Sequence, residues 1–202
     1  MLYFDCDYSC GMHPAILKRL QETNDEYSGT YGLDKYSEQA KQRIREACGD
    51  PDADIFFLIG GTQTNSTVID ALLKPWQGVV SAPTGHINVH EAGAIEFTGH
   101  KVIRLPDHED GLIRPDELET LILAFRDDDS RDHIVEPALI YFSFPTELGT
   151  LYTKEQFSAV YDVCKKYECR LFVDGARLGF GLGAEGNGIT LKFLADHCDA
   201  FY

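Results

Sequence analysis

The sequence predicts an α/β fold: a three-layer α/β/α arrangement in which helices cover both faces of a mostly parallel sheet. Two observations predict this fold class. Strand-like and helix-like segments alternate along most of the 202 residues, which is typical of parallel βα units. The strand-like segments are continuous apolar runs, such as ALIYFSF (138–144), and strands of this kind are usually buried on both faces.

The individual elements follow from apolar spacing and from residues that begin or end helices. Residues 13–24 and 37–49 have helical spacing, and we expect Ser37 to cap the second helix and Gly49 to end it. We expect strands at 54–61, 78–83, 101–106, 138–144, 170–174 and 199–202. We expect the remaining helices at 64–74, 87–97, 114–125, 154–167 and 190–198.

The charge balance is acidic, with 33 Asp and Glu against 18 Lys and Arg and a formal net charge of −15. This excess argues against non-specific binding to nucleic acid or to an anionic membrane, since both need clustered basic residues. The N-terminus MLYFDCDYSC resembles no signal peptide, and no apolar window is long enough to span a membrane. Six cysteines without CxxC pairs indicate reduced thiols, so we expect a cytoplasmic protein.

A glycine-rich turn follows the first apolar run, in IGGTQTN (59–65). Gly60 and Gly61 allow a tight turn, and Thr62 offers a hydroxyl and a backbone N–H at a helix start, which suits a phosphate group. An ordinary glycine-rich βα turn is the alternative. The segment matches neither GxGxxG nor GxxxxGK[ST], so dinucleotide and P-loop sites are disfavoured.

Histidines follow the next strand, in TGHINVHEAGA (84–94). His86 and His90 are four residues apart with Glu91 beside them, a pattern that raises zinc binding. The pattern is not HExxH and no third ligand is evident, so we predict no metal. His86 could instead present its ring to a planar ligand, or it could be an ordinary residue at a helix start.

Two further loops follow later strands. FPTELGT (144–150) carries Glu147 and is by itself a capped turn. In VDGAR (173–177), Asp174 leaves a buried strand and needs a partner. Arg177 could satisfy it as an ion pair, or both could face a ligand, with Asp174 taking a ring N–H and Arg177 a carboxylate or phenolate.

The carboxyl ends of parallel strands meet at one edge of a sheet, so these loops are expected to form one site. A phosphate-binding helix start, a ring that can stack and a carboxylate for a protonated ring nitrogen together suit pyridoxal phosphate.

The ordered set of motifs resembles the threonine aldolase and β-eliminating lyase family of fold-type-I pyridoxal-phosphate enzymes. The motifs are DYSCGMHPAIL (7–17), YGLD (31–34), GGTQTN (60–65), GHINVHEAGAIEFTGHK (85–101), TELGTLY (146–152) and VDGARLG (173–179). The resemblance implies an aspartate-aminotransferase-like large domain. It also implies aldol cleavage of β-hydroxy-α-amino acids, with threonine giving glycine and acetaldehyde.

The resemblance also implies roles for single residues and an assembly. Gly61 and Thr62 would bind the cofactor phosphate, His86 would stack on the pyridine ring, and Asp174 would pair with its nitrogen. Arg177 would contact the cofactor and bind the substrate carboxylate. His86 and Asp174 would be catalytic, and the enzyme would be a homodimer or homotetramer.

The sequence departs from the family at three places. Cys6-Asp7 stands where many members have Ser-Asp, with Asp7 expected at the substrate, and the FPTELG loop lacks the histidine that many members carry there. The Schiff-base lysine is expected a few residues beyond Tyr202, and neither Lys101 nor Lys192 lies where the motif places it. We therefore expect residues 1–202 to be the N-terminal part of the cofactor-binding domain, inactive as a fragment.

Three alternatives remain open from the sequence. Another pyridoxal-phosphate β-lyase or an aminotransferase could act on a different amino acid. A non-catalytic cofactor-binding-like or interaction domain would lack the lysine by design. A metal hydrolase would use His86, His90 and Glu91. In the leading interpretation, His86 or a bound water is the base that removes the β-hydroxyl proton.

Overall fold

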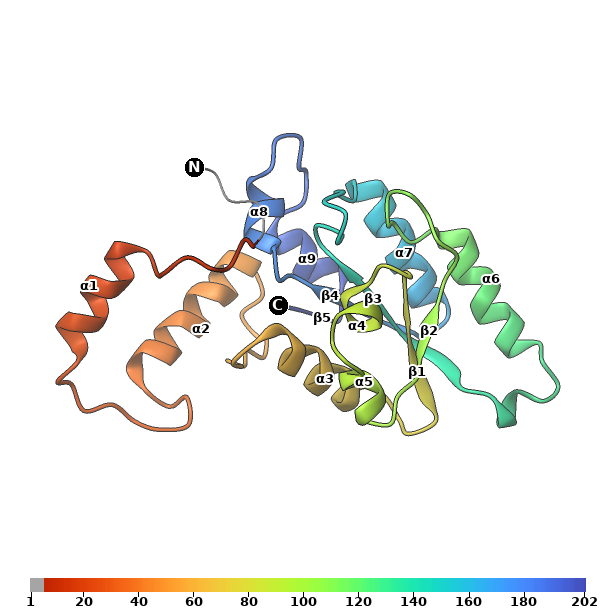
Figure 1. The fold of residues 1–202 in the computed structure, drawn as a ribbon, viewed down its shortest axis with the longest axis horizontal. Helices are drawn as coiled ribbons and strands as arrows, with labels where there is room; N and C mark the ends of the chain where they lie inside the picture. The colour runs from red at the N-terminus through yellow and green to blue at the C-terminus, as the bar shows by residue number, and fades with distance from the viewer. Residues whose placement is uncertain (1–5) are drawn as a thin grey trace. The chain divides into compact units, whose positions relative to one another are not determined.

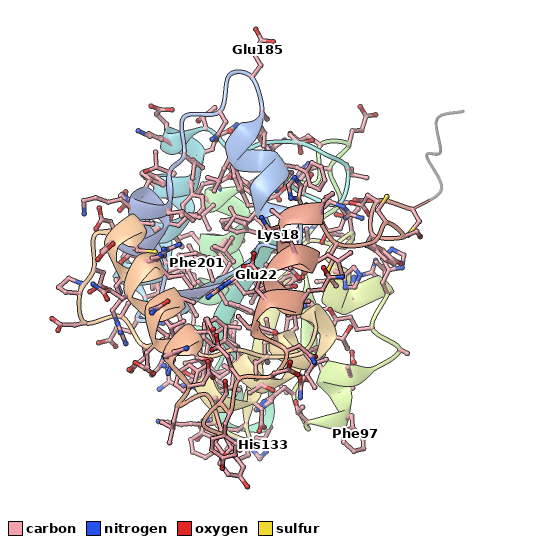
Figure 2. The ribbon with its side chains drawn as sticks, turned by 90° about the vertical axis from the view of Figure 1, so that its left-hand side faces the viewer. Lys18, Glu22, Phe97, His133, Glu185 and Phe201 are labelled. Carbon is pink, nitrogen blue, oxygen red and sulfur yellow. The ribbon has the colours of Figure 1, made fainter. Side chains whose placement is uncertain are left out.

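The computed structural model describes residues 6–202, and the chain divides into two compact units, Met1–Gln42 and Arg43–Tyr202. The first unit contains helix α1 (Pro14–Thr23), which confirms the helix expected at 13–24. Nδ1 of His13 accepts a hydrogen bond from the Ala15 amide and caps α1 at its start. On the same helix, Lys18 and Glu22 form an exposed ion pair at 3.8 Å (Figure 2).

Helix α2 (Lys35–Cys48) begins two residues earlier than the sequence predicts. The prediction that Ser37 caps it is wrong, because Asp34 Oδ1 accepts from the backbone amides of Tyr36 and Ser37 at 3.0 and 2.9 Å. A carboxylate at this position satisfies two amides that no carbonyl of the helix can reach. The predicted end is confirmed, since Gly49 follows the helix with φ +64°.

The second unit is built on a five-stranded parallel sheet in the order β2-β1-β3-β4-β5 (Figure 1). Its strands are β1 (Gln77–Ser81), β2 (Val102–Arg104), β3 (Glu136–Ser143), β4 (Arg170–Asp174) and β5 (Ala200–Phe201). Because all five run the same way, the loops that follow them lie along one edge. The parallel sheet expected from the continuous apolar runs is confirmed.

Helices cover both faces of this sheet (Figure 1), as the predicted three-layer arrangement requires. One face packs against α3 (Gly61–Leu72), α4 (His86–Val89) and α5 (Ala94–Phe97). The other packs against α6 (Pro115–Arg126), α7 (Lys154–Lys166) and α9 (Leu191–His197). The short elements η1 (Arg131–His133) and α8 (Leu178–Gly183) complete the unit, and Glu185 lies at the tip of the loop after α8 (Figure 2).

Side chains of the central strands alternate between the two hydrophobic cores. In β3, Leu139 and Tyr141 belong to the core beneath α3, whereas Ile140 and Phe142 belong to the core beneath α7. All four are at most 3 % exposed. This is why the strand shows a continuous apolar run in the sequence rather than an alternating one.

Two expected elements differ in the structure. The strand expected at 54–61 is wrong: residues 53–58 have no regular structure, and no strand of the described chain pairs with them. The helix expected at 87–97 is two short helices, separated where Ala92 and Gly93 take φ +53° and +78°. Within the described residues, no helix combines the length and apolar character needed to cross a membrane.

Candidate active site

A cleft lies at the carboxyl edge of the sheet, where the loops after β1, β3 and β4 meet. This is the edge at which open parallel α/β sheets bind ligands. Its lining comes from three loops that are far apart in the sequence, and consists of His86, Ser143, Pro145, Glu147, Asp174, Ala176 and Arg177. Three of the residues singled out from the sequence, His86, Asp174 and Arg177, therefore share one cleft.

Asp174 is the last residue of β4 and is 3 % exposed. Its Oδ2 accepts hydrogen bonds from the Tyr141 hydroxyl at 2.5 Å and from Asn65 Nδ2 at 3.0 Å. Its Oδ1 accepts from the Ala176 amide at 3.0 Å. Three donors thus satisfy the buried carboxylate and hold it as an acceptor. Burial and then the charge of Asp174 raise the pKa of Tyr141 well above its ordinary value, so this hydroxyl remains a donor.

His86 is the first residue of α4 and is fixed through its backbone. Its amide donates to Glu147 Oε1 at 2.7 Å, and the same oxygen accepts from Ser143 Oγ at 2.6 Å. The preceding Gly85 has no room for a side chain, since a Cβ there would collide with Ser81 Oγ. The loops after β1 and β3 are therefore joined at the point where the His86 ring enters the cleft.

A buried polar network runs behind the cleft. His86 Nδ1 lies 2.8 Å from Glu91 Oε1, and that oxygen also accepts from Asn65 Nδ2 at 2.7 Å. Asn65 in turn donates to Asp174. The sequence did not predict roles for Asn65 or Tyr141, and it indicated Glu91 only as a metal ligand. Among the described residues, no group of three His, Cys, Asp or Glu side chains is placed to hold a metal ion.

The two residues expected to bind phosphate lie at the start of α3. Gly60 is the extended residue before the helix, Gly61 is its first residue, and Thr62 follows with its side chain exposed. The first amides of a helix lack intrahelical acceptors and carry the positive end of its dipole. Asn65, one turn further on, contacts Asp174, so this helix start lies close to the end of β4.

Gly61 is also where the helix start approaches the last described residue. A Cβ at Gly61 would lie 2.8 Å from the Tyr202 hydroxyl. Burial and then the charge of Asp174 raise the pKa of Tyr202 above its ordinary value. The phenol therefore stays protonated beside the carboxylate.

Arg177 and Asp7 are the two residues for which the sequence predicts a role in binding the substrate. Arg177 precedes α8 (Leu178–Gly183), is exposed, and lines the cleft. Asp7 belongs to the first compact unit, so its expected place at the substrate stays a prediction.

The chemistry of these groups fits pyridoxal phosphate. A buried carboxylate suits a ring N–H, an imidazole at the cleft suits an aromatic face, and a helix start suits a phosphate. A guanidinium at the rim suits the carboxylate of an amino acid.

The fold and the cleft define an α/β protein with a candidate ligand site at the carboxyl edge of a parallel sheet. The chain belongs to the β-eliminating lyase family, whose model matches residues 10–201. This assignment confirms the family expected from the motifs and agrees with pyridoxal phosphate as the cofactor.

The relatives point in the same direction. The chain is 29 % identical over 176 residues to a low-specificity L-threonine aldolase of Pseudomonas aeruginosa, a match that covers 86 % of this chain and 49 % of that protein. A solved threonine aldolase from Leishmania major has a TM-score of 0.92 at 41 % identity, covering 97 % of this chain and 56 % of that one. An aromatic aminotransferase from Pyrococcus horikoshii shares the fold, with a TM-score of 0.70 at 18 % identity, covering 94 % of this chain and 49 % of that one. The chain thus spans about half the length of the curated relatives it matches.

Proposed function

We propose that residues 1–202 form the N-terminal part of the cofactor-binding domain of a pyridoxal-phosphate-dependent aldehyde-lyase. The full protein would cleave β-hydroxy-α-amino acids, with threonine giving glycine and acetaldehyde. The observation that carries this proposal is the buried Asp174 carboxylate, held by Tyr141 and Asn65 at the edge of a cleft that also contains His86 and Arg177. A charge buried at a strand end with this support is suited to pair with a protonated ring nitrogen.

In this mechanism each residue has a separate task. When bound, pyridoxal phosphate supplies an electron sink for the bond that breaks at Cα. Asp174 would accept the ring N–H, and the His86 ring would pack against the aromatic ring. The first amides of α3, at Gly61 and Thr62, would bind the phosphate. Arg177 binds the substrate carboxylate and so orients the Cα–Cβ bond.

A base must also take the proton of the β-hydroxyl as the Cα–Cβ bond breaks. The His86 ring is the titratable group in the cleft best suited to this task, either directly or through a water. Glu147 is less suited, because its Oε1 is already occupied by the His86 amide and Ser143.

The test uses the purified full-length protein with pyridoxal phosphate and L-threonine. We expect glycine and acetaldehyde in equal amounts, measured by amino-acid analysis and by NADH-coupled reduction of the aldehyde. Consumption of a keto acid without release of aldehyde would instead assign an aminotransferase. Absence of both products would overturn the proposal for threonine.

Assembly and location belong to the same proposal. We infer a homodimer or homotetramer in the cytoplasm, from the family resemblance and from the six cysteines with no disulfide framework. Light scattering coupled to size-exclusion chromatography measures the oligomeric state, and fractionation of cells measures the location.

A further inference from the structure

The polar network behind the cleft contains a second buried carboxylate, that of Glu91. Its side chain is fully buried, and its Oε1 lies 2.8 Å from Nδ1 of the His86 ring. An isolated buried charge is costly, so a carboxylate in this position needs a donor that stays in place. The donors are the imidazole Nδ1 of His86 and the amide of Asn65, and both reach Oε1. Oε2 is buried and has no hydrogen-bond partner among the described residues.

Asn65 limits how this network can be arranged. Its Nδ2 has two protons, and it lies within hydrogen-bond distance of two carboxylate oxygens, one on Glu91 and one on Asp174. If the amide were flipped, its own oxygen would face both of these acceptors. The unflipped orientation gives both Glu91 and Asp174 a donor. In this orientation Asn65 Oδ1 is buried without a hydrogen-bond partner among the described residues.

With Glu91 as an acceptor, the proton of His86 is placed on Nδ1. The hydrogen bond made by one imidazole nitrogen decides which tautomer the ring adopts. The other nitrogen, Nε2, then carries the lone pair. The His86 side chain is 42 % exposed and lines the cleft, whereas Glu91 is buried behind it.

We propose that Glu91 is a positioning residue for His86: it accepts the Nδ1–H, fixes the ring orientation, and leaves Nε2 as the acceptor available to the cleft. Asn65 joins this unit to Asp174, so the groups that would hold the ring nitrogen and the ring face are set by one network. The consequence for catalysis rests on the proposed function, whereas the assignment of the His86 tautomer is independent of it.

The test compares Glu91→Leu, which removes the acceptor, with Glu91→Gln, which keeps an acceptor oxygen but removes its charge. Glu96→Gln is the matched control, because Glu96 is an exposed residue of the neighbouring helix α5 and lies outside the cleft lining. Each variant of the full-length protein is labelled with ring-15N histidine, and the His86 signals are assigned with a His86→Gln variant.

The wild-type protein should show a protonated Nδ1 and an unprotonated Nε2. Glu91→Leu should shift His86 toward the Nε2–H tautomer. Glu91→Gln should retain Nδ1–H with its proton resonance moved upfield, because the acceptor is no longer charged. Glu96→Gln should match the wild type. If Glu91→Leu does not fold, the proton shift in Glu91→Gln decides, and an unchanged resonance there overturns the inference.

Kinetics give the second readout. We expect Glu91→Leu to lower kcat for threonine by about 10- to 100-fold, the size of effect found when a residue that orients a metal-bound histidine is removed. KM should change less, and Glu91→Gln should recover part of kcat. A His86 tautomer unaffected by Glu91→Leu would overturn the inference. If the wild-type protein fails to cleave threonine, the proposed function falls, while the ring-nitrogen signals still decide the role of Glu91.

Discussion

Tyr141 and Asp174 lie on neighbouring parallel strands, and the Tyr141 hydroxyl donates a 2.5 Å hydrogen bond to Asp174 Oδ2. Both side chains are almost fully buried. The Tyr141 hydroxyl therefore donates its hydrogen bond to the carboxylate and not to water.

Replacing Tyr141 with Phe should destabilise the protein in the absence of cofactor. The change removes a donor to a buried charge, which costs about 2 kcal/mol in the free energy of unfolding. Added pyridoxal phosphate should recover part of the loss, since its ring N–H would give Asp174 a new donor. Thermal unfolding with and without cofactor measures both effects.

The matched control for this variant is Tyr167→Phe. That hydroxyl also donates to a carboxylate, Glu119, but at a partly exposed position away from the cleft. We expect a smaller loss relative to the wild type. The cofactor should stabilise both proteins to the same extent, so this difference should stay the same when it is added. Equal losses in the two variants would contradict a special role for Tyr141.

Asp174→Asn should impair the reaction while leaving the fold intact. The amide is the same size but carries no charge to keep the ring nitrogen protonated. We expect the rate of threonine cleavage to fall by roughly 100- to 1,000-fold, the usual effect of removing one preorganised electrostatic group. Steady-state kinetics measure the rate, and the visible spectrum shows whether cofactor is still bound. A rate within about threefold of the wild type would refute the proposed role.

Gly175→Ala should lower stability, whereas Gly179→Ala should leave it unchanged or raise it. A Cβ at Gly175 would collide with the backbone oxygen of Tyr202, so the end of β5 would have to move away from the loop after β4. Gly179 lies in α8, where a Cβ meets nothing within 4 Å, and alanine favours a helix by up to about 1 kcal/mol over glycine. Differential scanning calorimetry should show a lower melting temperature for the first variant and an equal or higher one for the second.

Cys169 should resist alkylation in the folded protein up to unusually high pH. Burial raises the pKa of this thiol to about 11, and only the thiolate reacts. Because the folded state favours the neutral form, reactivity should begin to rise as the pH approaches 11, whereas an ordinary thiol is already ionised well below that. Timed labelling with iodoacetamide at pH 8 to 11, followed by mass spectrometry, tests this. Prompt labelling of native Cys169 at pH 9 would contradict it.

The sequence identified the residues that stand at the ends of strands. His86, Asp174 and Arg177 could be assigned to one site from the sequence alone, because parallel strands deliver their following loops to one edge. The residues that lie behind them in the structure could not be assigned to the site in this way. Asn65 occupies an ordinary polar position of a helix, and Tyr141 is one aromatic residue within an apolar run. Their importance depends on which helix lies over which strand, and local periodicity does not contain that information.

The expected strand at 54–61 was wrong for a related reason. An apolar, β-branched and aromatic run satisfies every local criterion for a strand, but a strand forms only when a neighbour accepts its backbone hydrogen bonds. The helix expected at 87–97 was interrupted by the positive φ of Ala92 and Gly93. This could not be predicted, because an alanine in a sequence does not indicate a positive φ. The apolar pattern of the sequence thus cannot predict which segments pair as strands, or where a single residue takes an unusual backbone dihedral angle.

The unpaired segment before α3 has a practical consequence for handling this polypeptide. Phe56, Phe57 and Ile59 are 80, 53 and 96 % exposed in a stretch that lacks regular structure, with no Pro, Lys or Arg among residues 55–59. Such a stretch is a template for intermolecular β-pairing and aggregation. Produced on its own, the 202-residue polypeptide should be prone to inclusion bodies, and Ile59→Lys would be the first change to try for improving its solubility.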